Sequence, residues 1–99
     1  MSGEALRRLD KDIAAEKAAA LGRAGERLEH ALAEVATLAE MVRATSDPLS
    51  RARVVAEYTA ARGRAQRARA ALLIQREALG LRHHGVVDQH FPEPPRLPR

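Results

Sequence analysis

The chain has 99 residues, a net charge of +4, no cysteine or tryptophan, and only two aromatic residues, Tyr58 and Phe91. This length suits one small domain, and a core built from Ala, Leu and Val is thin enough to favour oligomerisation. The lack of cysteine excludes disulfides and thiolate metal ligands, and no apolar run approaches the roughly 18 residues that span a bilayer.

The N-terminal segment lacks the basic start and continuous apolar run of a secretory signal peptide. It carries Glu4, Asp10 and Asp12 instead. We therefore expect a cytoplasmic protein that does not insert into a membrane. Binding to a membrane surface is also disfavoured, because the apolar helix faces are rich in alanine and flanked by acids.

A first helix is predicted over residues 3–45, which contain no proline and are rich in strong helix formers. Ser2 can cap its first turn, and Glu4 suits the positive end of the helix dipole. At helical spacing, an apolar stripe contains Leu6, Leu9, Ile13, Ala20, Ala24, Leu28, Ala31, Val35, Leu38 and Val42, with Lys17 interrupting it.

A second row of small or apolar residues lies beside that stripe. It comprises Ala14, Ala18, Gly25, Leu32, Ala36 and Ala39. Together the two rows cover about half of the helix circumference, which is more than one neighbouring helix needs.

A second helix is predicted over residues 48–79. Pro48 disfavours helix at Asp47 and suits a first helical position, while Asp47 or Ser46 can cap the new helix. Gly80 is a typical left-handed C-terminal cap. The apolar positions of this helix alternate in steps of four and three and form a heptad seam. The seam comprises Val54, Tyr58, Ala61, Ala65, Ala68, Leu72, Gln75 and Leu79.

A tight connection near Pro48 makes the two helices antiparallel, so the numbers of facing residues should sum to about 96. This register places Leu38 opposite Tyr58, and it lets large side chains meet small ones. It also predicts exposed ion pairs between the helices, which are Glu34 with Arg62 and Glu29 with Arg67.

The hairpin leaves two surfaces without a neighbour. Residues 1–16 extend past the end of the second helix, so Leu6, Leu9 and Ile13 have no helix packed against them. The second row on the first helix also lacks a neighbour. Both surfaces would be buried if two hairpins paired as a four-helix bundle, or if the tail folded back. We predict an all-α antiparallel two-helix hairpin that dimerises into a four-helix bundle.

The C-terminal segment 80–91 carries Leu81, Val86, Val87 and Phe91, which could pack against the helix ends if this segment folds back. From Pro92 onward, the prolines favour an extended polyproline conformation. We therefore expect a single domain over residues 1–91 and a flexible, proline-rich tail over residues 92–99.

Three of the four histidines, His83, His84 and His90, lie in this segment with Asp88. Metal binding by these histidines is one alternative function. Adjacent His83 and His84 diverge on a helix, however, and zinc needs three or four converging ligands. A polar helix end is favoured, because cationic histidines suit the C-terminal end of a helix dipole. We assign no metal and no cofactor.

No pattern of a catalytic site is present. Ser2, Ser46 and Ser50 stand in cap-like positions, and Asp10 and Asp12 point away from each other on a helix. We therefore expect a protein that is not an enzyme.

Weak nucleic-acid binding is the main alternative function, because the second helix is strongly basic. One row holds Arg51, Arg62, Arg69 and Arg76, and another holds Arg53, Arg64 and Arg67. Phosphate contacts need little more than such charges. The rows flank the apolar seam, where ion pairs between helices would form, and no aromatic residues interleave them for base stacking. This alternative is not favoured.

Two stretches, AAEKAAALGRAGERLEHAL (14–32) and QREALGLRHHGVVDQHFPEP (75–94), resemble a group of short, uncharacterised bacterial proteins of the domain-of-unknown-function kind. Those proteins look like helical hairpins that end in Q-R-E, a Gly, and then a Val, an aromatic residue and a Pro. The corresponding positions are Gln75, Arg76, Glu77, Gly80, Val87, Phe91 and Pro92. Phe91 stands where Tyr is expected, and the proline-rich end departs from the pattern.

The resemblance implies no catalytic residue, because the family has no known activity. It does suggest that Gln75, Arg76 and Glu77 bond the returning tail and hold Gly80 to Phe91 against the bundle end. Gln75 also lies in the apolar seam, where a polar residue can specify register. We expect a helical protein–protein interaction or assembly module, a homodimer with a protein partner that the sequence does not identify.

Overall fold

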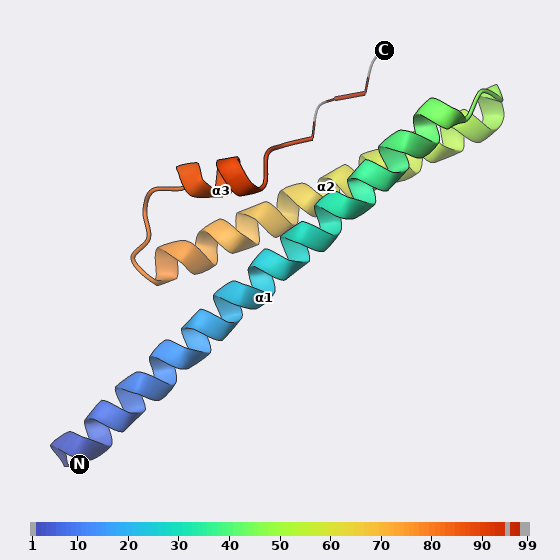
Figure 1. Ribbon diagram of the computed structural model, residues 1–99. Helices are drawn as coiled ribbons and strands as arrows, with labels where there is room; N and C mark the ends of the chain where they lie inside the picture. The colour runs from blue at the N-terminus through green and yellow to red at the C-terminus, as the bar shows by residue number, and fades with distance from the viewer. Residues whose placement is uncertain (1, 95, 98–99) are drawn as a thin grey trace.

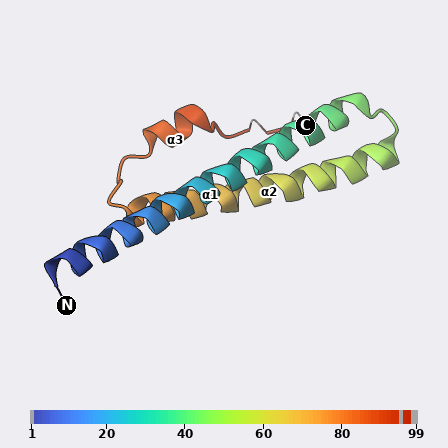
Figure 2. The same cartoon turned by 60° about the horizontal axis from the view of Figure 1, so that its bottom comes forward.

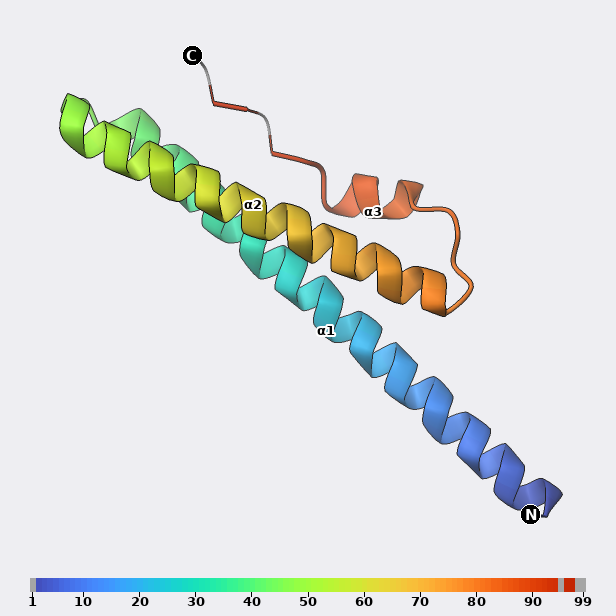
Figure 3. The ribbon, with the colours of Figure 1, turned by 180° about the vertical axis from the view of Figure 1, so that it is seen from behind.

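The computed structural model describes residues 2–94, 96 and 97, and this part of the chain forms three helices and no strand. They are α1 (Gly3–Ala44), α2 (Pro48–Ala78) and α3 (Gly85–His90). α1 and α2 run antiparallel and pack along each other (Figure 1), while α3 and the residues after it return along the hairpin (Figure 3). The predicted all-α hairpin is therefore confirmed.

Side-chain caps set where both long helices begin. The N–H of Ala5 donates to Ser2 Oγ at 3.1 Å, and the N–H of Ser50 donates to Asp47 Oδ2 at 2.9 Å. These bonds satisfy amide groups that a helix start leaves without an intrahelical partner. Hydrogen bonds from the backbone and side chain of Ser50 lower the pKa of Asp47. The predicted last residues, 45 and 79, lie one residue beyond the observed helix ends.

Gly80 ends α2 and turns the chain back, as the sequence predicted. Its φ of 81° lies in the left-handed region. The Gly80 N–H donates to the Glu77 carbonyl at 2.9 Å, and the Leu81 N–H donates to the Arg76 carbonyl at 3.0 Å. This pair of bonds is the Schellman arrangement, and it satisfies carbonyls that the helix end would otherwise expose.

The core consists of two clusters along the α1–α2 seam. The cluster near the hairpin turn contains Val35, Leu38, Val42, Tyr58, Ala61 and Ala65. The cluster near the open end contains Ala24, Leu28, Leu72 and Val87. Large side chains of one helix meet small side chains of the other, so the helices approach closely. Leu38 and Tyr58 share one cluster, as the predicted register requires.

The ion pair predicted between Glu34 and Arg62 is wrong, because Glu34 pairs with Arg64 at 2.6 Å. In an antiparallel pair, flanks on the same side of the seam meet. Arg64 shares the side of Glu34, whereas Arg62 lies on the opposite side, where the tail returns. The predicted ion pair of Glu29 with Arg67 is also absent among the described residues. Glu29, like Arg62, lies on the side of the seam where the tail returns.

The molecule is a rod that measures 69 × 22 × 14 Å. The N-terminal part of α1 projects past the end of α2 (Figure 2). The Cα radius of gyration is 18.9 Å, against about 12.6 Å for a compact domain of this length. In the described part of the chain, no helix has both the length and the apolarity that a membrane crossing requires.

Candidate interaction surfaces

The projecting part of α1 carries an apolar stripe that no other element of the described chain covers. Leu6, Leu9 and Ile13 are 47%, 45% and 42% exposed, and they follow one another at helical steps of three and four. The stripe continues into Ala24 and Leu28, which are buried against α2. The same face of α1 is therefore exposed in the N-terminal part of the helix and buried against α2 further along, as the sequence predicted.

The returning tail, which comprises residues 81–94, 96 and 97, is docked on the hairpin through Arg69 of α2. Its Nη1 donates to Asp88 Oδ1 at 2.7 Å, and its Nη2 donates to the carbonyl of Phe91. The Arg69 side chain is only 15% exposed. One guanidinium thus holds two points of the α3 segment by charge-assisted bonds, which are stronger than neutral ones.

A second set of polar contacts holds the loop before α3. Arg76 Nε donates to His84 Nδ1 at 3.2 Å, and Arg76 Nη2 donates to the His83 carbonyl at 2.8 Å. Because Arg76 can only donate, Nδ1 accepts, and His84 Nε2 is left to carry the proton that faces Glu77 Oε1 at 3.3 Å. His84 therefore bridges two adjacent residues of α2.

Apolar contacts complete the docking of α3. Val87 is 4% exposed and packs with Leu28 and Leu72 in the open-end cluster, and Phe91 packs against the same cluster. α3 was not predicted from the sequence, and it begins at Gly85.

The residues singled out by the resemblance mostly meet in this region. Arg76 and Glu77 bond the loop, Gly80 makes the turn, Val87 and Phe91 pack on the hairpin, and Pro92 lines the groove described below. The side chain of Gln75 is half-buried and makes no hydrogen bond to any described residue. Arg69, Asp88 and His84 supply contacts that sequence reasoning missed.

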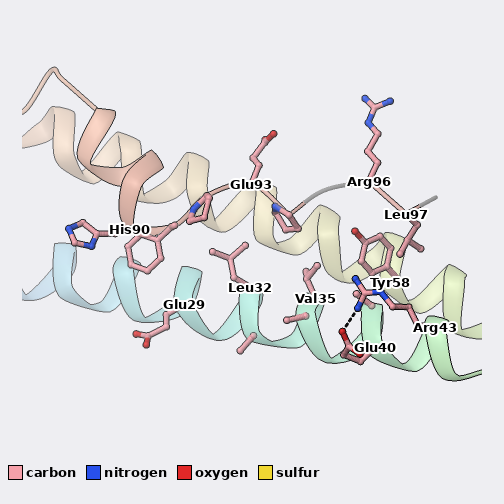
Figure 4. Close-up of a pocket in the computed structure, with 16 residues that line it drawn as sticks. Glu29, Leu32, Val35, Glu40, Arg43, Tyr58, His90, Glu93, Arg96 and Leu97 are labelled. Atoms are coloured by element: carbon pink, nitrogen blue, oxygen red, sulfur yellow. Dashed lines mark hydrogen bonds and ion pairs between the residues drawn. The ribbon is translucent and has the colours of Figure 1, made fainter. Parts of the chain in front are cut away.

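A groove of about 580 Å³ lies between α1 and the returning tail (Figure 4). Leu97 packs against the cluster that contains Tyr58, so the tail follows the hairpin beyond Phe91. The expected mobility of residues 92–99 stays a prediction, and residues 95, 98 and 99 lie outside the described residues. The walls of the groove include Leu32, Ala33, Val35, Ala36, Ala39, Phe91, Pro92, Pro94 and Leu97, and its charged residues are Glu29, Glu40, Arg43, Glu93 and Arg96.

The arginine rows of α2 are partly occupied by contacts within the chain. Arg64 pairs with Glu34, and Arg69 and Arg76 hold the returning tail. The Nε of Arg62 is buried and has no hydrogen-bond partner in the part of the chain that the structure describes. The rows therefore do not form a continuous free surface for phosphates.

The tail histidines do not converge. His84 faces Arg76 and Glu77, His83 is exposed, and the ring of His90 stacks at a tilt against Phe91 with centroids 6.5 Å apart. Within the described ranges, no group of three or more His, Asp or Glu side chains is placed to hold a metal ion.

No family model matches the chain, and neither a curated protein nor a solved structure shows significant similarity to it. The resemblance to the short bacterial hairpin proteins therefore stays a prediction.

Proposed function

We propose that the chain is a non-enzymatic helical assembly module that pairs with a second copy of itself. The observation that carries this proposal is the open stripe of Leu6, Leu9 and Ile13, each of which is nearly half exposed. Apolar side chains at this spacing form the contact face of a helix that packs on another helix. The core of this chain is small, so a second copy that buries the open face would stabilise the fold.

The surface area of the single chain supports assembly. The chain exposes 7319 Å², whereas a compact monomer of this mass exposes about 5,500 Å². The excess of roughly 1,800 Å² is larger than the about 800 Å² that each partner contributes to a standard protein interface. Association of two rods along their length would remove much of this excess.

The charges of α2 favour assembly over the nucleic-acid alternative. Arg69 and Arg76 bind the tail, and Arg64 binds an acid of α1. Each arginine engaged in this way is less available for the phosphate contacts that dominate nucleic-acid affinity.

The test is the mass of the protein in solution by light scattering, for the unmodified chain, Leu9→Glu and Leu49→Glu. Leu49 is the matched control, because it is 75% exposed and lies at the hairpin turn. We expect about twice the chain mass of 10.8 kDa for the unmodified protein and Leu49→Glu, and 10.8 kDa for Leu9→Glu. A monomeric mass for the unmodified chain at micromolar concentration contradicts the proposal, as does a dimeric Leu9→Glu variant.

A further inference from the structure

The groove beside α1 has two walls that both carry apolar side chains, and they come from different elements. One wall is α1 itself, with Ala33, Ala36 and Ala39 exposed or half-buried, and the other is the returning tail with Phe91 and Pro92. Side chains this small leave room for a helix backbone to approach closely. An occupant that fits such a groove is a helix with two apolar faces rather than one.

The first half of α1 is a helix of that kind. Its stripe of Leu6, Leu9 and Ile13 forms one face, and Ala14 and Ala18 begin the second. Consecutive helical residues such as Ile13 and Ala14 point about 100° apart, so one face can contact α1 of the second copy while the other contacts its returning tail. Building on the proposed self-assembly, we infer that the groove holds the first half of α1 from a second copy, which runs antiparallel.

Charge complementarity selects one register for this contact. In an antiparallel pair, facing residues have a constant sum of residue numbers, and Glu4 with Arg43 has the same sum as Arg7 with Glu40. One register therefore brings two pairs of opposite charge together. Glu40 and Arg43 form an ion pair with each other and with no other described residue, and their side chains are 75% and 57% exposed, so both can take new partners.

Two-fold symmetry makes the contact reciprocal. The first half of each α1 enters the groove of the other copy, so each charge pair occurs twice and the contact closes as a dimer rather than a filament. The stripe then faces the returning tail of the second copy, and Ala14 and Ala18 face its α1. Both uncovered surfaces of the single chain are buried in one step.

The same register places Gly22 opposite Gly25 of the second copy, at the centre of the contact. A Cβ added at either glycine meets no atom within 4 Å in the single chain, so packing within the chain does not require glycine there. Glycine also destabilises a helix interior relative to alanine. Close approach of two α1 backbones at this crossing accounts for both residues.

Charge reversal across the contact tests the register. Arg7→Glu places its new carboxylate against Glu40 of the second copy, and Glu40→Arg places its new guanidinium against Arg7. Each variant alone should raise the dimer dissociation constant roughly 5- to 30-fold, because two attractive pairs become repulsive. An equimolar mixture should recover near-native affinity as a heterodimer, because every contact is then between opposite charges.

Arg8→Glu is the control, since it makes the same charge change on the adjacent residue, which points about 100° away from Arg7 on the helix. Its dissociation constant should match that of the unmodified chain, and circular dichroism should show unchanged helix content in all variants. Sedimentation velocity over a concentration series gives the constants.

The outcomes separate this inference from the proposed self-assembly. If the unmodified chain dimerises and Leu9→Glu prevents it, but Arg7→Glu and Glu40→Arg bind normally, the groove inference is wrong and self-assembly stands. Weakening by both variants without recovery in the mixture also overturns the inference. A monomeric unmodified chain overturns both.

Discussion

Arg69 of α2 donates to the carboxylate of Asp88 in α3 at 2.7 Å, across nineteen positions of the chain. The same guanidinium donates to the carbonyl of Phe91, just past the end of α3. Because Arg69 is largely buried while Asp88 is 74% exposed, the arginine is the fixed partner and the tail is the element that docks. This contact gives the returning tail a defined place on the hairpin, and with it the second wall of the groove.

Replacing Arg69 by Met should loosen the returning tail while leaving the hairpin folded. The change removes charge-assisted bonds to two points of the tail, and we expect the docking free energy to fall by about 1–3 kcal/mol. Hydrogen exchange should show faster exchange of the α3 amides and little change in α1. Arg67→Met is the control, because Arg67 is exposed and has no ion pair among the described residues. Equal exchange rates in the two variants would show that Arg69 does not hold the tail.

Val87 should be the main apolar anchor of α3, because it is 4% exposed whereas its neighbour Val86 is 43% exposed. Val87→Ala removes two buried methyl groups and should lower the unfolding free energy of the tail by about 1–3 kcal/mol. Val86→Ala deletes the same atoms at the surface and should change it little. Amide exchange in α3 measures both, and a larger effect from Val86→Ala would contradict the observed docking face.

Gly80 should resist substitution because of its backbone conformation rather than its surroundings. An alanine at a φ of 81° is strained, although an added Cβ would meet no atom within 4 Å. Gly80→Ala should therefore cost roughly 1–2 kcal/mol, whereas Gly85→Ala, where φ is not positive, should be neutral or stabilising. Urea unfolding gives both values. A neutral Gly80→Ala would show that the turn tolerates another conformation.

The Asp47 cap should make the hairpin turn sensitive to acid. The bonds from Ser50 lower the pKa of Asp47 in the folded chain, so its contribution to stability is present above the unfolded carboxyl pKa of about 3.9. That contribution is lost as the pH falls through the lower folded pKa, because the protonated carboxyl is a weaker acceptor. Asp47→Asn keeps a capping side chain without a titrating group. The unfolding temperature should drop more between pH 5 and pH 3 in the unmodified chain than in Asp47→Asn. Parallel curves would contradict the cap assignment.

Local sequence signals predicted the parts of the fold that local interactions determine. Ser2, Asp47 and Gly80 mark helix ends by bonds to residues a few positions away, and the apolar spacing identified the faces that meet. α3 escaped prediction because six residues are too few for a periodic pattern, and a helix this short depends on tertiary docking for its stability.

Long-range polar contacts of the candidate site could not be predicted from spacing. Arg69 and Arg76 belong to a regular row of arginines, and the neighbouring sequence does not distinguish them from Arg51 or Arg62. Only their contacts with the returning tail set them apart. Of the three residues named by the Q-R-E resemblance, Arg76 and Glu77 bond the loop before α3, whereas the side chain of Gln75 makes no hydrogen bond to a described residue. The error over Arg62 arose because numerical register alone does not say on which side of the seam a flank lies.

The central claim is that a second copy covers the open half of α1. Sedimentation equilibrium of the unmodified chain over a range of concentrations tests this claim most directly. The account predicts an average mass that rises with concentration from 10.8 kDa and levels off at about twice that value. It also predicts that Leu9→Glu keeps the average mass at the lower value throughout. A mass of 10.8 kDa for the unmodified chain throughout the micromolar range would contradict the account.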